Sequence, residues 1–373
     1  MDTILSLLLY VIVGIVCVLV SRKADKNEKR AFWIIVILLT LLAGFRHETV
    51  GIDTPAYVEL TAKLRNGWLS RLNNIDEKGF IFLSFIIVNI TKGYTWLLLV
   101  YSFIINFFVI KRLFDERENI SLPWAMYIFL CQYYLMTFNT IRQWIALAVI
   151  FYFSKYIGKG LRGNIGFIIS VAVATLFHKT ALLAVALVVI YYVFKQSKKL
   201  TSSLAKIGVV LIAPVAAVVL LNYMQNHYGG IYASSGLNGD VSIITIVRLG
   251  VILFLMFFSF FDEPYSFINF EPEMSLEDKA HAKHLLHFNS AAMLLGVACT
   301  MMIFFYRYAD RLALYFMVYE MLVWPYYIKN SRMKGFVKIL VILLFAYLRI
   351  MSFRANGYGE MPYLPFWANV GQV

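Results

Sequence analysis

A succession of long apolar runs constrains this chain more than any other feature. A transmembrane helix needs about 20 apolar residues, because the hydrocarbon core of a bilayer is about 30 Å thick. Apolar side chains make up 61% of the 373 residues, whereas soluble proteins contain about half. Because spanning segments must satisfy their backbone hydrogen bonds internally, we predict an all-α polytopic membrane protein.

The runs indicate about twelve crossings within one membrane domain, residues 1–373. The clear spans are residues 4–20, 32–45, 94–110, 123–138, 144–157, 207–222, 241–261, 288–306, 312–328 and 336–353. Residues 80–90 are too few to cross the core, which favours a short re-entrant or interfacial helix. Residues 165–194 are too many for one upright helix, so this run is predicted to go out and return, turning near His178.

Charge sets the predicted orientation. Most of the 34 Lys and Arg residues lie in short loops between the runs, and such loops face the cytoplasm. Both termini then lie outside. The net charge of +13 does not indicate nucleic acid, since no basic stripe with interleaved aromatic residues is present.

Cysteines and histidines give no metal motif. Cys17, Cys131 and Cys299 each stand alone in an apolar run, so their spacing indicates no disulfide framework or metal knuckle, and we interpret them as packing residues. Residues 281, 284 and 287 are histidines on one helical stripe on the cytoplasmic side. This pattern favours an interfacial amphipathic helix over a metal site.

Arginines at the ends of the runs, or inside them, are the main candidates for a functional site. They are Arg46, Arg142, Arg248, Arg307, Arg311 and Arg349. The predicted topology brings all six to the outer face, and a guanidinium binds phosphate oxygens through two donors at once. We therefore expect a pocket for an anionic, lipid-borne substrate. Snorkelling to lipid headgroups is the alternative for Arg46, Arg307 and Arg354. Arg248, in contrast, lies inside its run and needs a partner or a wet cavity.

Three further groups have two interpretations each. His178 is a candidate base or phosphate donor, or a hydrogen-bonded structural residue. Asp53 either caps a helix predicted from Ala56 or binds a sugar hydroxyl and takes its proton. Glu320, predicted to lie mid-span, either pairs with an arginine or marks an ion path.

Several short motifs follow one another in a fixed order. They are Ala43-Gly44-Phe45-Arg46, Val50-Gly51-Ile52-Asp53 with Tyr57, Lys78-Gly79-Phe80, Ile141-Arg142-Gln143, Leu176-Phe177-His178-Lys179-Thr180-Ala181, and Arg307 to Arg311 with Tyr315-Phe316. In this order they resemble the EpsG family of Wzy-type polysaccharide polymerases. The chain departs from the family's pattern at Lys179-Thr180 and at His47.

The resemblance implies a multi-pass glycosyltransferase with a GT-C-like scaffold in the bacterial cytoplasmic (inner) membrane. Its active site would face outward and join oligosaccharide repeat units carried on undecaprenyl diphosphate, as in exopolysaccharide or O-antigen synthesis. The implied partners are this lipid-linked glycan, the bilayer, a flippase and chain-length regulators, without nucleic acid. No cofactor or metal is implied.

The same interpretation assigns roles to the candidate residues. Arg142 and Arg248 would stabilise the diphosphate leaving group, and Asp53 or His178 would act on the acceptor hydroxyl. The remaining substrate-binding candidates are Arg46, Arg307, Arg311, Arg349 and Tyr57. Two other functions stay open, a glycan ligase using the same donor and a transporter or flippase in which Glu320 couples cargo movement to protons.

Overall fold

A computed structural model describes residues 3–66, 77–91, 93–195, 246, 250–251, 276–302, 309–332 and 334–368. These residues form helices and no β-strand, as predicted. The helices are α1 (Thr3–Ser21), α2 (Glu28–Gly44), α3 (Thr54–Arg65), α4 (Lys78–Thr91), α5 (Tyr94–Asp115), α6 (Leu122–Ile128), α7 (Ile141–Phe153), α8 (Gly160–Thr175), α9 (Ala186–Lys195), α12 (Leu276–Met301), α13 (Ala309–Met317), α14 (Glu320–Asn330) and α15 (Lys334–Ala355), with shorter π and 3₁₀ segments between some of them.

The chain divides into two compact units. Unit 1 comprises Met1–Tyr152, Ser170–Ala181 and Phe336–Val373, and unit 2 comprises Phe153–Ile169 and Leu182–Gly335. The single membrane domain predicted over residues 1–373 stays a prediction, since two such units can belong to one folding domain.

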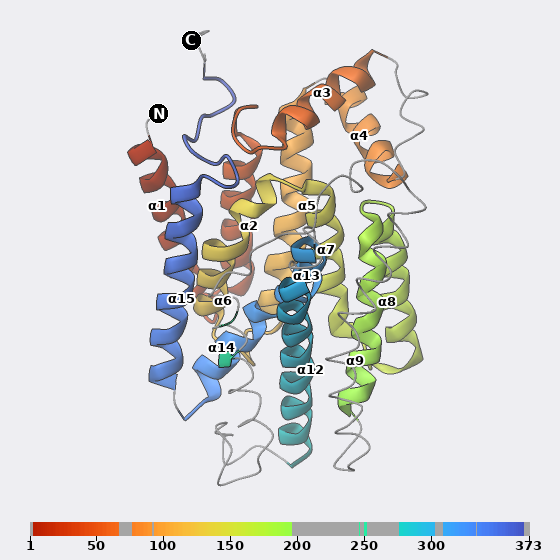
Figure 1. Cartoon of the computed structure of the whole chain (residues 1–373), viewed down its shortest axis with the longest axis vertical. Helices are drawn as coiled ribbons and strands as arrows, with labels where there is room; N and C mark the ends of the chain where they lie inside the picture. Colours follow the sequence, from red (N-terminus) through yellow and green to blue (C-terminus); the bar gives the residue numbers. More distant parts are fainter. Residues whose placement is uncertain are drawn as a thin grey trace. The chain divides into compact units, whose positions relative to one another are not determined.

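In unit 1, α1, α2, α5 and α15 run side by side with alternating direction (Figure 1). Helices α2 and α5 pack closely at Gly44, where an added Cβ would lie 2.8 Å from Leu99 Cα. A glycine is needed at this position because no side chain fits between the two backbones. The close packing fixes the end of α2, from which the chain enters the Arg46 loop.

The C-terminal segment folds back over the start of α1 and over the loop after α2. Tyr363 N donates to Ser6 Oγ at 2.9 Å, and His47 N donates to Leu364 O at 2.7 Å. Gly51 N also donates to Gly359 O at 2.8 Å. Segments from both ends of the chain therefore meet at one end of unit 1, which is the upper end in Figure 1.

Three of the described helices are long and apolar enough to cross a membrane, namely Thr3–Ser21, Tyr94–Asp115 and Lys334–Ala355. They correspond to three of the predicted spans. The total of about twelve crossings and the GT-C-like scaffold stay predictions. The predicted spans at residues 207–222 and 241–261, and the intervening outer loop, lie outside the described residues apart from isolated helical positions.

One of the two unusual runs forms a short helix and the other is broken, as predicted. The re-entrant or interfacial placement of the first and the two crossings of the second stay predictions. Helix α4 has 14 residues, which at about 1.5 Å per residue is too short for a core of about 30 Å. The 165–194 run is broken, because α8 ends at Thr175 and α9 begins at Ala186. Within unit 2, Asn164 Nδ2 donates to Tyr192 Oη at 2.5 Å, so the chain returns beside its starting point and forms a hairpin.

Two predicted spans are not regular helices. Residues 123–138 continue from α6 into a π-helical segment, Phe129–Tyr133, and a 3₁₀ turn, Leu135–Phe138. The predicted span 312–328 is wrong as a single helix, because it breaks between α13 and α14. Glu320 lies in the middle of this run, as predicted, where it is the first residue of α14, and it is fully buried. A hydropathy pattern does not detect the π-helical segment or the break between α13 and α14, because the residues of both runs remain apolar.

The histidine stripe is also corrected. Helix α12 runs without interruption from Leu276 to Met301, so the stripe belongs to the same helix as the predicted span 288–306 and is not a separate interfacial helix. In unit 2, α12 packs against α9, α13 and α14, and the His284 ring lies 4.6 Å from the ring of Tyr191. The described contact of His284 is thus with an aromatic side chain of α9. Among the described residues, no group of three His, Cys, Asp or Glu side chains is arranged to hold a metal ion.

Candidate functional site

A buried carboxylate, Glu77, joins two of the predicted site residues. Its Oε2 accepts a hydrogen bond and forms an ion pair with Arg142 Nη1, and its Oε1 lies 2.6 Å from His178 Nδ1. The Glu77 side chain is 9% exposed, whereas that of Arg142 is 42% exposed. We call Glu77, Arg142 and His178 the charged cluster. It lies within unit 1.

The contact with Glu77 indicates which tautomer the His178 ring adopts. An ionised carboxylate only accepts hydrogen bonds, so Nδ1 of His178 carries the proton. In the neutral imidazole Nε2 is then the acceptor and is able to take a proton from a bound hydroxyl. Arg142 has donors beyond the one held by Glu77, and its exposed side chain can offer them to an anion.

Backbone contacts between two distant segments hold the cluster together. Gly79 N and Phe80 N both donate to Leu176 O, at 3.0 and 3.3 Å. A Cβ on Gly79 would lie 2.7 Å from Leu176 Cβ and 3.1 Å from Leu176 O. Glycine therefore allows the start of α4 to dock on the turn that carries His178.

Asp53 and Tyr57 hold the start of α7, which carries Arg142. Thr140 N donates to Asp53 Oδ2 at 2.7 Å, and Ile141 N donates to Tyr57 Oη at 3.0 Å. These are among the backbone donors that the first turn of a helix leaves without internal partners. Burial raises the pKa of Tyr57 to about 12, so its hydroxyl stays protonated at neutral pH.

Asp53 caps a helix, as one of its two interpretations predicted, but that helix is α7 and not α3. Asp53 occupies the cap position of α3 but makes no side-chain bond to that helix. Its carboxylate instead caps α7, 87 residues away. Its backbone N–H donates to Asn139 Oδ1 at 3.0 Å, and Asn139 Nδ2 donates to Tyr358 O at 2.8 Å. Its predicted catalytic role stays a prediction.

Arg46 is fully buried, and its guanidinium is bound to the protein itself. Nε donates to Val50 O at 3.2 Å, Nη2 donates to Phe138 O at 2.9 Å, and Nη1 donates to Ala43 O. Burial lowers the pKa of Arg46 to about 10, which still leaves it protonated at neutral pH. Arg46 thus ties the 46–54 loop to the turn before α7, and its predicted contact with substrate remains a prediction.

The other predicted arginines are not brought to the charged cluster by the described contacts. Arg349 donates from Nε to Cys131 O at 2.8 Å, and its Nη1 lies 3.8 Å from Glu360 Oε1. Arg311 is exposed on α13 in unit 2, where its backbone N–H donates to Asp310 Oδ1. Arg248 and Arg307 lie outside the described residues.

Glu77, Asn139 and Glu360 are the site residues that sequence reasoning missed. Glu77 had one available signal, since it is an acidic residue directly before Lys78-Gly79-Phe80 and the apolar run that follows. Its importance depends on contacts with residues 65 and 101 positions away. No local pattern in the sequence reports such distances.

The fold and the charged cluster together define a class, an all-helical membrane protein that carries a carboxylate-linked Arg and His near the ends of its helices. The chain belongs to the EpsG family, whose model matches residues 29–366. This family comprises Wzy-type polymerase-like proteins. No curated protein and no solved structure matches the chain.

Proposed function

We propose that the chain is a polysaccharide polymerase of the extracytoplasmic face of the bacterial inner membrane. It would join oligosaccharide repeat units carried on undecaprenyl diphosphate. Membership of the EpsG family supports a polymerase-like role in polysaccharide synthesis. The Arg142–Glu77–His178 cluster is the observation that carries the mechanism.

In the proposed reaction, an acceptor sugar hydroxyl attacks the anomeric carbon of the donor sugar. The new glycosidic C–O bond forms as the bond from that carbon to the diphosphate oxygen breaks, and both electrons of the broken bond leave with the lipid diphosphate. The hydroxyl proton passes to His178 Nε2. Glu77 then stabilises the imidazolium through the 2.6 Å contact to Nδ1, as a carboxylate does for a catalytic histidine elsewhere.

Arg142 is the proposed ligand of the departing diphosphate. Its side chain is 42% exposed while one nitrogen is held by Glu77, so the guanidinium is oriented and still has donors to offer. Stabilising charge that grows on a leaving group lowers the barrier more than binding the ground state does. Arg248, Arg307 and Arg311 remain proposed ligands on the basis of their positions in the sequence.

The orientation is proposed from charge. Arg117 Nη2 lies 3.0 Å from Glu28 Oε2, so the basic segments 21–30 and 111–117 meet at the start of α2. The end of α2 and the Arg46 loop lie at the other end of that helix. Basic loops face the cytoplasm in membrane proteins. The charged cluster would then face outward, where lipid-linked repeat units are presented by a flippase and product length is set by a regulator.

The test supplies the purified chain, in a lipid bilayer, with an undecaprenyl diphosphate oligosaccharide and no nucleotide. We expect a ladder of products that differ by one repeat unit. Arg142→Ala and Arg248→Ala should each abolish elongation at unchanged protein level, with Arg65→Ala, on the exposed end of α3, as the control. Wild-type chain lengths in either variant would remove that residue from the mechanism.

Two other results of this experiment would replace the proposal. Transfer of the intact glycan to an acceptor other than a repeat unit would indicate a ligase. Movement of intact substrate between leaflets without any longer product would indicate a transporter.

A further inference from the structure

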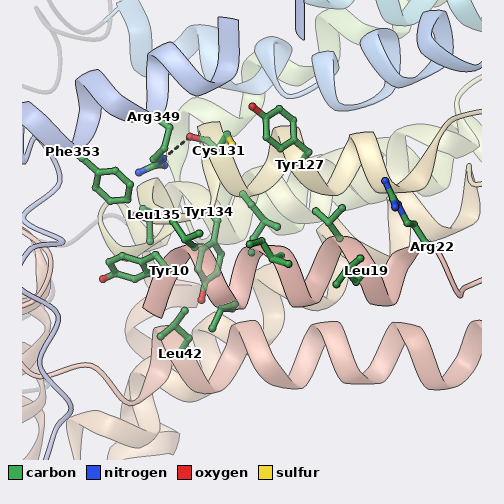
Figure 2. A pocket seen from close by; sticks show the side chains of 16 residues that line it. Tyr10, Leu19, Arg22, Leu42, Tyr127, Cys131, Tyr134, Leu135, Arg349 and Phe353 are labelled. Atoms are coloured by element: carbon green, nitrogen blue, oxygen red, sulfur yellow. Dashed lines mark hydrogen bonds between the residues drawn. The ribbon is translucent and has the colours of Figure 1, made fainter. Parts of the chain in front are cut away.

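A cavity of about 360 Å³ lies in unit 1 along α1, apart from the charged cluster. It is bordered by α1, the segment 127–135 and α15 (Figure 2). Apolar side chains form most of its wall, including Val13, Leu19, Leu42, Leu130, Leu135 and Phe353. From Tyr10 to Arg22, the residues of α1 that line it extend about 18 Å along the helix axis, so the cavity is long as well as apolar.

Arg349 lies at one end of this cavity (Figure 2). Its Nε donates to Cys131 O at 2.8 Å, where the backbone passes through the π-helical segment. Its Nη1 and Nη2 are buried and have no hydrogen-bond partner. The Glu360 carboxylate lies 3.8 Å from Nη1, so it balances the charge without engaging the two donors.

The tyrosines of the cavity wall have no comparable unused groups. Tyr10 Oη donates to Glu360 O at 2.9 Å, and Tyr134 Oη donates to Leu39 O at 2.6 Å. Tyr127 Oη donates to Ile342 O at 3.3 Å. Of the two arginines that line the cavity, Arg22 is exposed, whereas Arg349 has buried donors left to offer. A planar guanidinium matches the oxygens of a phosphate.

We infer that this cavity binds a lipid phosphate, with the hydrocarbon chain along α1 and the phosphate on Nη1 and Nη2 of Arg349. Charge complementarity favours a phosphate at this end, and the apolar wall favours a long chain beside it. Most of α1 and α15 is not packed inside the protein, so a lipid could enter sideways from the bilayer. The identity of the lipid as a polyprenyl phosphate or diphosphate rests on the proposed function.

Gly14 allows the chain-binding part to be tested without disturbing the protein. It lines the cavity, and a Cβ added there would meet nothing within 4 Å. The backbone at Gly14 therefore accepts a side chain, and Gly14→Leu adds apolar volume at the cavity wall. Gly166→Leu on α8 is the matched control, since an added Cβ there also meets nothing within 4 Å. Arg349→Gln removes the charge at the phosphate end.

The experiment measures binding of undecaprenyl phosphate to the full chain in phosphatidylcholine nanodiscs. Competitors are phosphatidylglycerol and inorganic diphosphate. We expect Gly14→Leu and Arg349→Gln to weaken binding by roughly ten- to a hundredfold, while Gly166→Leu binds as the wild type does. Inorganic diphosphate should compete poorly, because it lacks the hydrocarbon chain. Phosphatidylglycerol should compete poorly, because its phosphate is a diester with a single negative charge and carries a glycerol headgroup in place of a terminal phosphate.

Wild-type affinity in Gly14→Leu would overturn the inference, and this variant decides the matter if Arg349→Gln does not fold. Equal competition by phosphatidylglycerol would overturn the identity of the ligand as a polyprenyl phosphate, because the cavity would then hold an ordinary bilayer phospholipid. Tight lipid binding that depends on Gly14, without any product ladder, would support the lipid site and exclude the polymerase function. A normal ladder, with no effect of either variant on lipid binding, would support the polymerase function and exclude the lipid site.

Discussion

At the scale of single residues, Glu77 determines what Arg142 and His178 can do. It binds both through different oxygens, so one buried carboxylate orients a guanidinium and an imidazole together. Removing a shared, buried partner leaves two groups without their hydrogen bonds, which costs more than either contact contributes alone. Arg46 shows the opposite case, because its hydrogen bonds all end on the protein.

Glu77→Gln should lower the elongation rate by about a hundredfold or more with little change in apparent KM. The physical reason is that the amide keeps the shape of the side chain but cannot stabilise an imidazolium. Measuring kcat and KM with a defined lipid-linked donor checks this split between the two constants. Glu59→Gln, at an exposed ion pair with Lys63, is the matched control. An unchanged kcat in Glu77→Gln would exclude Glu77 from the mechanism.

Asp53→Asn separates the two roles of that side chain. Asparagine keeps an oxygen that can accept from Thr140 N, but it is not a base. If Asp53 is a cap, Asp53→Asn should retain elongation, whereas Asp53→Ala should lose about 1 kcal/mol of stability. Thermal unfolding in detergent and the product ladder give the two measurements. A stable Asp53→Asn protein without activity would make Asp53 the base in place of His178.

At the scale of elements, the site depends on irregular joints between helices. The start of α4 docks on the turn after α8, and the start of α7 is capped by side chains around the start of α3. The π-helical segment after α6 is also an irregular part of the helical frame, and such segments often occur at functional positions. There, the Cys131 carbonyl accepts from Arg349. The residues of the charged cluster therefore lie at or next to the ends of helices, and the contacts between these ends determine their positions.

Gly79→Ala should break one of these joints. The added Cβ would lie 2.7 Å from Leu176 Cβ, so the start of α4 must move away from the His178 turn. We expect about 1–3 kcal/mol of destabilisation and a loss of elongation, read from thermal unfolding and product length. Gly166→Ala is the control and should be neutral or slightly stabilising, since it meets nothing within 4 Å and lies in a helix. Equal stability of the two variants would show that the close contact is not required.

At the scale of the whole molecule, orientation in the bilayer decides whether the charged cluster can meet an extracytoplasmic substrate. In a background with Cys17, Cys131 and Cys299 replaced, Ile52→Cys and Glu118→Cys place thiols at exposed positions, one near the cluster and one in a basic loop. A membrane-impermeant maleimide should label Ile52→Cys in intact cells and Glu118→Cys only after permeabilisation. Labelling in the opposite pattern would put the cluster in the cytoplasm and end the polymerase proposal.

The helical membrane class follows from the sequence, as do a short helix over residues 80–90, which the structure extends to Lys78–Thr91, and the turn at His178. Length and hydropathy act locally, because an apolar run must satisfy its own backbone whatever it packs against. The breaks within residues 123–138 and 312–328 were not predictable in this way, because each break leaves the composition apolar. The pairing of Arg142 and His178 through Glu77 was not predictable either.

The sequence by itself therefore determined that this chain is a helical membrane protein of the EpsG family, and it supplied the arginines and the histidine as candidates. Only the tertiary structure showed that Arg142 and His178 contact the same carboxylate and that the guanidinium of Arg46 is hydrogen-bonded within the protein. It also showed that Arg349 has two buried donors without a hydrogen-bond partner. The physical reason is that hydropathy is a property of consecutive residues. An ion pair or a cavity depends on side chains that folding brings together from distant segments.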